Sequence, residues 1–145
     1  MATWPFIGYN AGDYLNHWDK ISAKLNPEQM PKIFLVNWFR RTPEGGFAWP
    51  GFGDNSRVLK WAVERIEGTA DAKETAIGYV PTGEALDLSG LEDFTAADVE
   101  TAVAVNTDEW VEEVKSIEEW YAKFGDALPA SLRGELDGLK ERLGA

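Results

Sequence analysis

Residues 32–57 read KIFLVNWFRRTPEGGFAWPGFGDNSR and carry the strongest signals of fold and function in this chain. Residues 33–40 are rich in β-branched and aromatic side chains, which predicts a buried strand. The TPEGG run at 42–46 has the composition of a turn, and residues 47–49 would supply a short return strand. We therefore expect a β-hairpin over residues 32–50.

Large aromatic side chains in this stretch suggest a pocket with aromatic walls. They are Trp38, Phe39, Phe47, Trp49 and Phe52, and they lie beside glycines and a proline that turn the chain. Aromatic rings bind a flat heterocycle by stacking on its faces. At the pocket edge, the amide of Asn55 offers both a donor and an acceptor to the rim of the heterocycle. The stretch predicts a pocket for the base of a purine nucleotide.

The same rings could instead be the core of a hairpin that binds nothing. Aromatic residues at strand spacing usually pack against one another, and composition alone favours this alternative. The two interpretations make different predictions. A binding pocket requires that the rings of Phe39, Phe47 and Phe52 enclose a vacant slot and that the amide of Asn55 faces it.

Helical patterns surround the aromatic stretch. Asp54 or Asn55 is predicted to cap a helix over residues 55–67, which Gly68 ends. Its expected apolar face is Val58, Trp61, Ala62, the stem of Arg65, and Ile66. Other expected elements are a short helix over residues 14–21, a strand over 77–80, helices over 95–104 and from 107 to just before Gly125, and a terminal helix after Pro129. The last two have apolar stripes at Trp110, Val114, Ile117, Tyr121 and Phe124, and at Leu132, Leu136, Leu139 and Leu143.

These patterns predict an α+β fold, in which a short β-hairpin or small mixed sheet is packed by about five helices. A chain of 145 residues is about one domain. We expect one compact unit with two parts. Residues 1–94 would be the aromatic, base-binding part, and residues 95–145 an acidic helical part.

Charge and composition exclude several classes of partner. The formal net charge is −11, and residues 84–145 account for all of the acidic excess. We expect no nucleic-acid partner, because neutralising its phosphates requires a basic face. No apolar run approaches the roughly 20 residues of a membrane span, and no secretory signal is recognisable. The chain has no cysteine, which fits the reducing cytoplasm, where we expect the protein to be.

Three arginines lie close to the aromatic stretch, where an anionic ligand could use them. They are Arg40, Arg41 and Arg57. For each of them taken singly, the favoured interpretation is an ordinary surface arginine.

Several long motifs resemble one enzyme family. They are NWFRR at 37–41, WPGFGDNSRVLKW at 49–61, PFIGYNAGDYLNHW at 5–18, IGYVP at 77–81, LDLSGL at 86–91 and ELDGLKERL at 135–143. Together they resemble the C-terminal segment of GTP-dependent phosphoenolpyruvate carboxykinase, of a bacterial type. The resemblance runs from Pro5 to the C-terminus. It therefore covers nearly all of this chain but a minority of the enzyme, which implies the C-terminal part of a larger α/β protein.

The resemblance implies a specific binding site. The family decarboxylates oxaloacetate and phosphorylates the enolate with GTP, giving phosphoenolpyruvate, carbon dioxide and GDP. Phe39 and Phe52 match the rings that hold guanine, and Phe47 matches a third ring that closes the same pocket. Trp38 matches a tryptophan beside the base. The run Phe52-Gly53-Asp54-Asn55 matches the family's nucleotide-contact stretch, in which Asn55 matches the amide that addresses the guanine edge.

The chain departs from the family pattern in three places. Ala48 replaces a larger apolar residue, and Asp54 replaces the more usual glutamate. Residues 1–4 do not resemble the start of such an enzyme, whose lid and catalytic core should precede Pro5. We therefore expect a fragment whose partners are a guanine nucleotide and the missing catalytic core.

The catalytic equipment of the family is not recognisable in this sequence. Phosphoryl transfer requires a phosphate cradle, a lysine and metal ligands, and there is no GxxxxGK[ST] run. We assign no catalytic residue and no metal ligand; the manganese and magnesium ions implied by the family would bind to the parent enzyme only. His17, with Asp13 four residues before it, is interpreted as a partly buried structural histidine. Whether the chain is itself an enzyme is left open, and we expect it to be inactive alone.

Ring stacking also predicts an affinity, and two other functions compete with nucleotide binding. Two stacked faces contribute roughly 2–6 kcal/mol before ordering costs, so the chain alone should bind nucleotide at about millimolar affinity or weaker. The main alternative is a non-catalytic interaction or assembly module, which would present its leucine and aromatic faces to a partner chain. A standalone enzyme is a third hypothesis.

Overall fold

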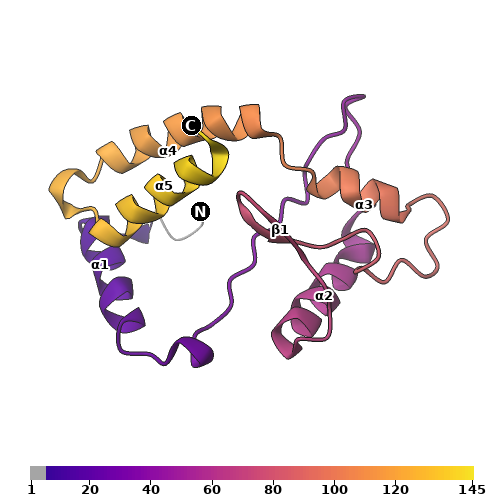
Figure 1. Cartoon of the computed structure of the whole chain (residues 1–145), viewed down its shortest axis with the longest axis horizontal. Coiled ribbons are helices and arrows are strands. Elements are labelled where there is room, and N and C mark those ends of the chain that lie inside the picture. Colours follow the sequence, from indigo (N-terminus) through magenta and orange to yellow (C-terminus); the bar gives the residue numbers. More distant parts are fainter. Residues whose placement is uncertain (1–5) are drawn as a thin grey trace. The chain divides into compact units, whose positions relative to one another are not determined.

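The computed structural model describes residues 6–145, and in that range it contains five α-helices and two short strands (Figure 1). The helices are α1 (Ala11–Ser22), α2 (Asn55–Glu67), α3 (Ala96–Val103), α4 (Thr107–Ala122) and α5 (Ala130–Leu143). The strands are β1 (Lys73–Thr75) and β2 (Gly78–Val80), and short 3-10 turns span Pro27–Gln29, Phe52–Asp54 and Gly125–Ala127. This confirms the predicted α+β class. Residues 1–5 lie outside the described residues, and so do two expectations that fall on them: the departure at residues 1–4 and the start of the family resemblance at Pro5.

The chain forms two compact units. One is Lys32–Val105, and the other is the chain up to Pro31 together with Asn106–Ala145. The two parts expected from the sequence, 1–94 and 95–145, remain a prediction beside this division. In the unit Lys32–Val105, Val99 of α3 is 1% exposed and packs with Trp61 and Leu86.

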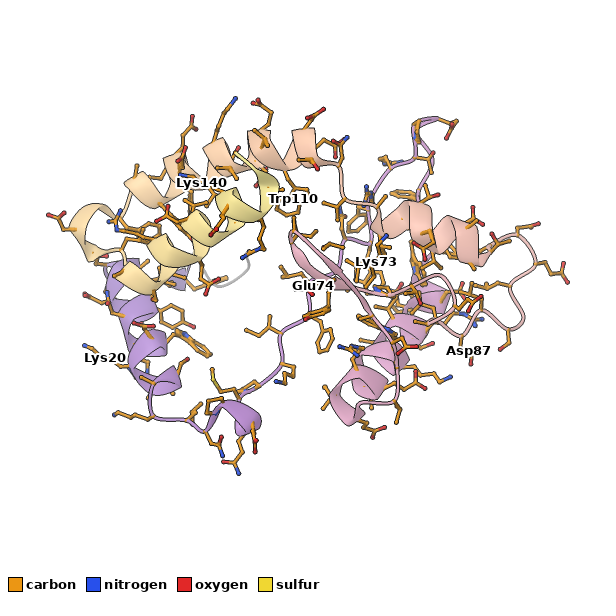
Figure 2. The ribbon with its side chains drawn as sticks, viewed as in Figure 1. Lys20, Lys73, Glu74, Asp87, Trp110 and Lys140 are labelled. Carbon is orange, nitrogen blue, oxygen red and sulfur yellow. The ribbon has the colours of Figure 1, made fainter. Side chains whose placement is uncertain are left out.

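The unit that contains the C-terminus is built on α4 and α5, which lie side by side and run antiparallel (Figure 1). Asn106 caps α4, because its side-chain oxygen accepts hydrogen bonds from the backbone N–H groups of Asp108 and Glu109. The predicted capping residue, Thr107, is instead the first helical residue. Both predicted stripes are confirmed, since every member is at least partly buried, and Val114, Leu136 and Leu143 are buried. Figure 2 labels Lys140 on α5, whose ammonium pairs with Glu118 of α4.

Helix α1 docks in this unit through a small residue. Asn10 caps the helix, its side chain accepting from the N–H of Gly12 at 2.8 Å. Gly12 is buried against Ala127, and a Cβ built on it would lie 2.5 Å from the carbonyl oxygen of that residue. Asn16 donates to the same carbonyl at 3.0 Å. The close approach of α1 therefore requires glycine at position 12.

The unit Lys32–Val105 has its core between α2, α3 and the segment that links them. The buried side chains are Trp61, Leu86 and Val99, and Trp49, Leu88 and Phe94 pack around them. Helix α3 begins with the predicted capping box of Thr95 and Asp98, and α2 ends at Gly68, which has φ 75°. Strand β2 confirms the strand expected at 77–80 and pairs with β1 in an antiparallel register.

The strand predicted for residues 33–40 is wrong. Residues 31–37 form no regular structure, and Ile33 and Leu35 are 84% and 95% exposed. The predicted hairpin over 32–50 is confined to a tight turn, where Arg41 and Phe47 form a single bridge and Ala48 N–H donates to the carbonyl of Arg40. A strand requires a partner for its backbone groups, and no segment of this unit pairs with residues 33–37.

The outer face of α2 also differs from the prediction. Trp61 is buried as expected, but Ile66 is 61% exposed. Leu59 and Val63 lie on the same helical stripe as Ile66, at spacings of four and three, and are exposed too. The helix therefore has a second apolar face, which residues 6–145 leave exposed. Within residues 6–145, no helix is both long enough and apolar enough to cross a bilayer.

Candidate functional site

Trp49 anchors the aromatic segment to the core of its unit. Its ring meets Phe94 edge-on, with centroids 5.4 Å apart, and lies 6.1 Å from the ring of Trp38. Phe94 itself packs against the buried cluster of Trp61, Leu86 and Val99. The two tryptophans of the segment are thus partly buried and belong to the scaffold of the site.

The three phenylalanines are held at the surface. Phe39 and Phe47 are 74% and 53% exposed, and they touch edge to face, with centroids 6.2 Å apart and planes at 62°. Phe52 is 92% exposed, in a 3-10 turn that follows Gly51 (φ 142°). The contact between Phe39 and Phe47 leaves no slot between those two rings. A flat ligand would therefore stack on the free faces of these two rings or on Phe52, and a single slot formed by all three rings stays a prediction.

Asp54 and Asn55 make contacts other than the expected helix cap. Asp54 is the residue before α2, but its side chain makes no capping hydrogen bond. It accepts from Arg57 Nε at 3.0 Å instead. The side-chain oxygen of Asn55 accepts from Trp49 Nε1 at 2.9 Å. Position 54 therefore braces the helix start, and the amide at 55 is tied to the aromatic scaffold.

The arginines near the segment have partners within the protein. Arg40 donates to the carbonyls of Ala102 and Ala104, both at 2.8 Å, at the C-terminal end of α3. That end of a helix favours a cation. The guanidinium of Arg41 lies 3.8 Å from the centre of the Phe47 ring, a cation–π contact that orients this ring. These contacts make both arginines part of the framework that holds the phenylalanines.

Asp87 connects α2 to the irregular segment before α3, where Figure 2 labels it. Its carboxylate accepts from the hydroxyl and the N–H of Ser89, and from Lys60 Nζ at 3.0 Å. Its carbonyl accepts from Arg57 at 2.6 Å. The hydrogen bond from the Ser89 hydroxyl, followed by that from Lys60, holds the pKa of the Asp87 carboxyl well below its ordinary value.

Replacing Asp87 with asparagine should therefore lower stability in a pH-dependent way. The ionised carboxylate stabilises the fold above its unfolded-state pKa of about 3.9, and this contribution is lost as the pH falls toward the depressed folded-state pKa. We expect the stability difference between the parent chain and Asp87→Asn to be larger at pH 7 than at pH 3. Urea unfolding at both pH values measures it. An equal difference at both would contradict the assignment.

A shallow depression adjoins the aromatic segment. It has a volume of about 380 Å³ and is lined by Phe47, Trp49, Pro50 and residues 90–94. Of the predicted site residues only Phe47 lines it. The side chains of Glu92 and Asp93 make this depression a poor place for phosphate groups.

Comparison with known proteins identifies the family. The family model of the phosphoenolpyruvate carboxykinase C-terminal P-loop domain matches residues 1–142. The chain is 72% identical over 144 residues to the phosphoenolpyruvate carboxykinase [GTP] of Paenarthrobacter aurescens, and 70% identical over 143 residues to that of Arthrobacter sp.. These alignments cover 99% of this chain in both cases, and 24% and 23% of the relatives. The chain belongs to the GTP-dependent phosphoenolpyruvate carboxykinase family. A more distant relative, the enzyme of Neocallimastix frontalis, is 50% identical over 146 residues, which cover all of this chain and 24% of that protein.

The chain spans about a quarter of the length of these carboxykinases. The matched domain is named for a P-loop, but no GxxxxGK[ST] run occurs in the 145 residues. The matched residues include parts of both compact units, and the aromatic segment belongs to the unit Lys32–Val105.

The described residues do not form a site that fits a metal ion. The sequence indicated a partly buried His17, and this is wrong, because α1 turns Gly12 and Asn16 toward Ala127 and leaves His17 exposed. Asp13 is exposed as well. Within residues 6–145, no group of three or more potential ligand side chains could hold a metal. We derive no step through a metal ion.

Sequence reasoning missed two residues of the site framework. The sequence predicts Trp49 as one of the rings but not as a binding residue, and its indole N–H donates to the side-chain oxygen of Asn55. The sequence gives no signal for Phe94, whose ring meets that of Trp49 edge-on. In the sequence, Trp49 stands six residues before Asn55. Because a turn lies between the two residues, this spacing alone does not predict a contact.

Proposed function

We propose that this chain is the guanine-binding part of a GTP-dependent phosphoenolpyruvate carboxykinase. The parent enzyme would convert oxaloacetate and GTP to phosphoenolpyruvate, carbon dioxide and GDP in the cytoplasm, with manganese and magnesium bound outside this chain. The chain itself carries no catalytic residue and is inactive alone. The binding residues are Trp38, Phe39, Phe47, Phe52, Gly53, Asp54 and Asn55.

The single observation that carries this proposal is the exposure of the phenylalanine rings. Phe39 and Phe52 are 74% and 92% exposed, and a large aromatic side chain gains nothing by facing water. A base that stacks on such a ring contributes about 1–3 kcal/mol. The backbone that presents Phe52 is set by Gly51, whose φ of 142° favours glycine. The family relationship supports the assignment of these rings to a nucleotide.

The choice of base depends on the polar edge. Stacking does not discriminate between guanine and adenine, because every base has a π-face. Guanine carries a carbonyl acceptor where adenine carries an amino donor. Asn55 lies three residues from Phe52, and its amide is the side chain of the set best suited to read this difference.

Replacing Phe52 with alanine should weaken guanine-nucleotide binding at least about fivefold, since it removes one stacking face. Amide chemical shifts of the 145-residue chain, titrated with GTP up to tens of millimolar, measure the dissociation constant. Shift changes should be confined to residues 37–57 in the parent chain. Phe6→Ala is the matched control, because Phe6 is 86% exposed and lies in the other compact unit.

Two outcomes would count against the proposal. One is a folded parent chain with no shift changes at residues 37–57. The other is a Phe52→Ala variant that binds GTP as tightly as the parent chain and the Phe6→Ala control do.

A second candidate function, an interaction or assembly module, is favoured by one observation. Leu59, Val63 and Ile66 form an exposed apolar stripe on α2, and Ile33 and Leu35 are exposed in the preceding segment. Such a surface suits a partner protein, including the remainder of a carboxykinase. Light scattering at rising concentration distinguishes a surface that self-associates from a chain that remains monomeric.

A further inference from the structure

The amide of Asn55 has a fixed polarity. Trp49 Nε1 lies 2.9 Å from the Asn55 side-chain oxygen. An indole N–H only donates hydrogen bonds, so the atom that faces it must be the carbonyl oxygen of the amide and not its nitrogen. The Nδ2 group, with its two N–H donors, is consequently the part of Asn55 left for a ligand.

The indole that imposes this polarity is itself immobilised. Its ring contacts both Phe94 and Trp38, and it packs against the buried cluster around Trp61. The other end of the pair is fixed by the backbone, since Asn55 is the first residue of α2 and its N–H donates to the carbonyl of Phe52. Neither partner can reverse the hydrogen bond, because flipping the amide would place N–H against N–H.

We propose that Trp49 is a positioning residue that makes Asn55 act as a donor, and so selects purines with a carbonyl oxygen at carbon 6. Guanine and hypoxanthine carry that acceptor, whereas adenine presents an amino donor at the same position and meets two N–H groups. The inference rests on the proposed function. It adds to that function one residue, Trp49, which contacts Asn55 and not the base itself. A donor pair left facing each other is less favourable than a donor that meets an acceptor, by about the value of one hydrogen bond.

Trp49→Phe tests this role, because it keeps an aromatic ring and removes only the N–H donor and the second ring. The probes are GDP, IDP and ADP, titrated into the 145-residue chain and followed by amide shifts. We expect the parent chain to bind GDP and IDP at least about tenfold more tightly than ADP. This ratio corresponds to one hydrogen bond from Asn55 that GDP and IDP accept and ADP does not. In Trp49→Phe the amide is free to turn, and the three dissociation constants should fall within about threefold of one another. Trp18→Phe, an exposed tryptophan in the other unit, should keep the preference of the parent chain.

A second variant covers the case in which Trp49→Phe does not fold. Asn55→Asp keeps an oxygen for the indole but has no N–H to donate, so its preference should shift toward ADP. A readout without nucleotide is also available: the indole N–H of Trp49 should exchange slowly with solvent in the parent chain and faster in Asn55→Ala.

The outcomes distinguish a failure of the proposed function from a failure of the role assigned to Trp49. If the parent chain binds neither GDP nor ADP, the proposed function fails, and this inference fails with it. If the parent chain prefers GDP and both Trp49→Phe and Asn55→Asp keep that preference, the proposed function stands and the role of Trp49 is overturned. If IDP behaves like ADP, the amino group at carbon 2 makes the selection, which also overturns it.

Discussion

Replacing Trp61 with alanine is expected to destabilise the unit Lys32–Val105 by about 3–5 kcal/mol, the usual cost of deleting a large aromatic side chain from a core. Trp61 is 5% exposed and forms the centre of the cluster with Leu86 and Val99. Its ring also meets Phe34 edge-on at 5.9 Å. Its indole N–H donates to the carbonyl of Asp71 at 3.1 Å, so the substitution removes a hydrogen bond as well as packing.

Urea unfolding and amide hydrogen exchange in α2 and α3 measure this loss. Trp61→Phe is the matched control. It keeps most of the apolar contact and forfeits the donor to Asp71, so we expect a cost of about 1–2 kcal/mol. A Trp61→Ala variant within 1 kcal/mol of the parent chain, or with unchanged exchange in both helices, would show that this cluster is not the core of the unit.

Replacing Gly12 with valine is expected to destabilise the other unit by about 3 kcal/mol, the upper part of the range for overpacking. A Cβ at position 12 would lie 2.5 Å from the carbonyl oxygen of Ala127 and 2.6 Å from its Cβ. Backbone atoms cannot move aside as a flexible side chain can. Helix α1 would have to shift, and the hydrogen bond from Asn16 to the same carbonyl would be lost.

Gly134→Val in α5 is the control for this prediction. Nothing lies within 4 Å of a Cβ at that position, so only helix propensity changes, by less than about 0.5 kcal/mol. Thermal unfolding of the two variants, followed by circular dichroism, compares them directly. Equal melting temperatures would mean that α1 does not dock where Gly12 and Ala127 place it.

The helices were predictable because their signals are local. Gly68 at the end of α2, the capping box at Thr95, and the stripes of α4 and α5 all depend on residues within four positions of one another. The absence of a strand at residues 33–40 was not predictable in the same way. β-Propensity shows that a segment would suit a sheet, but only a partner strand makes it one, and this unit offers none to residues 33–37.

The candidate site shows the same difference between local signals and contacts that depend on the folded chain. Trp38, Phe39, Phe47, Phe52 and Asn55 could be selected from the sequence because they crowd into one short stretch. The contacts that orient them could not be selected. The distance from Trp49 to Asn55 depends on the course of a turn, and the placement of Arg40 depends on carbonyls that lie 62 and 64 residues later in the sequence.

Arg40 has a consequence for the order of folding. Arg40 directly follows Phe39, and its guanidinium donates to two carbonyls at the end of α3. These carbonyls lie 62 and 64 residues later in the sequence. Closing a loop of that length costs chain entropy that no local contact near position 40 can offset. The rings at the surface should consequently reach their final arrangement late, after α3 has formed and presented its last carbonyls.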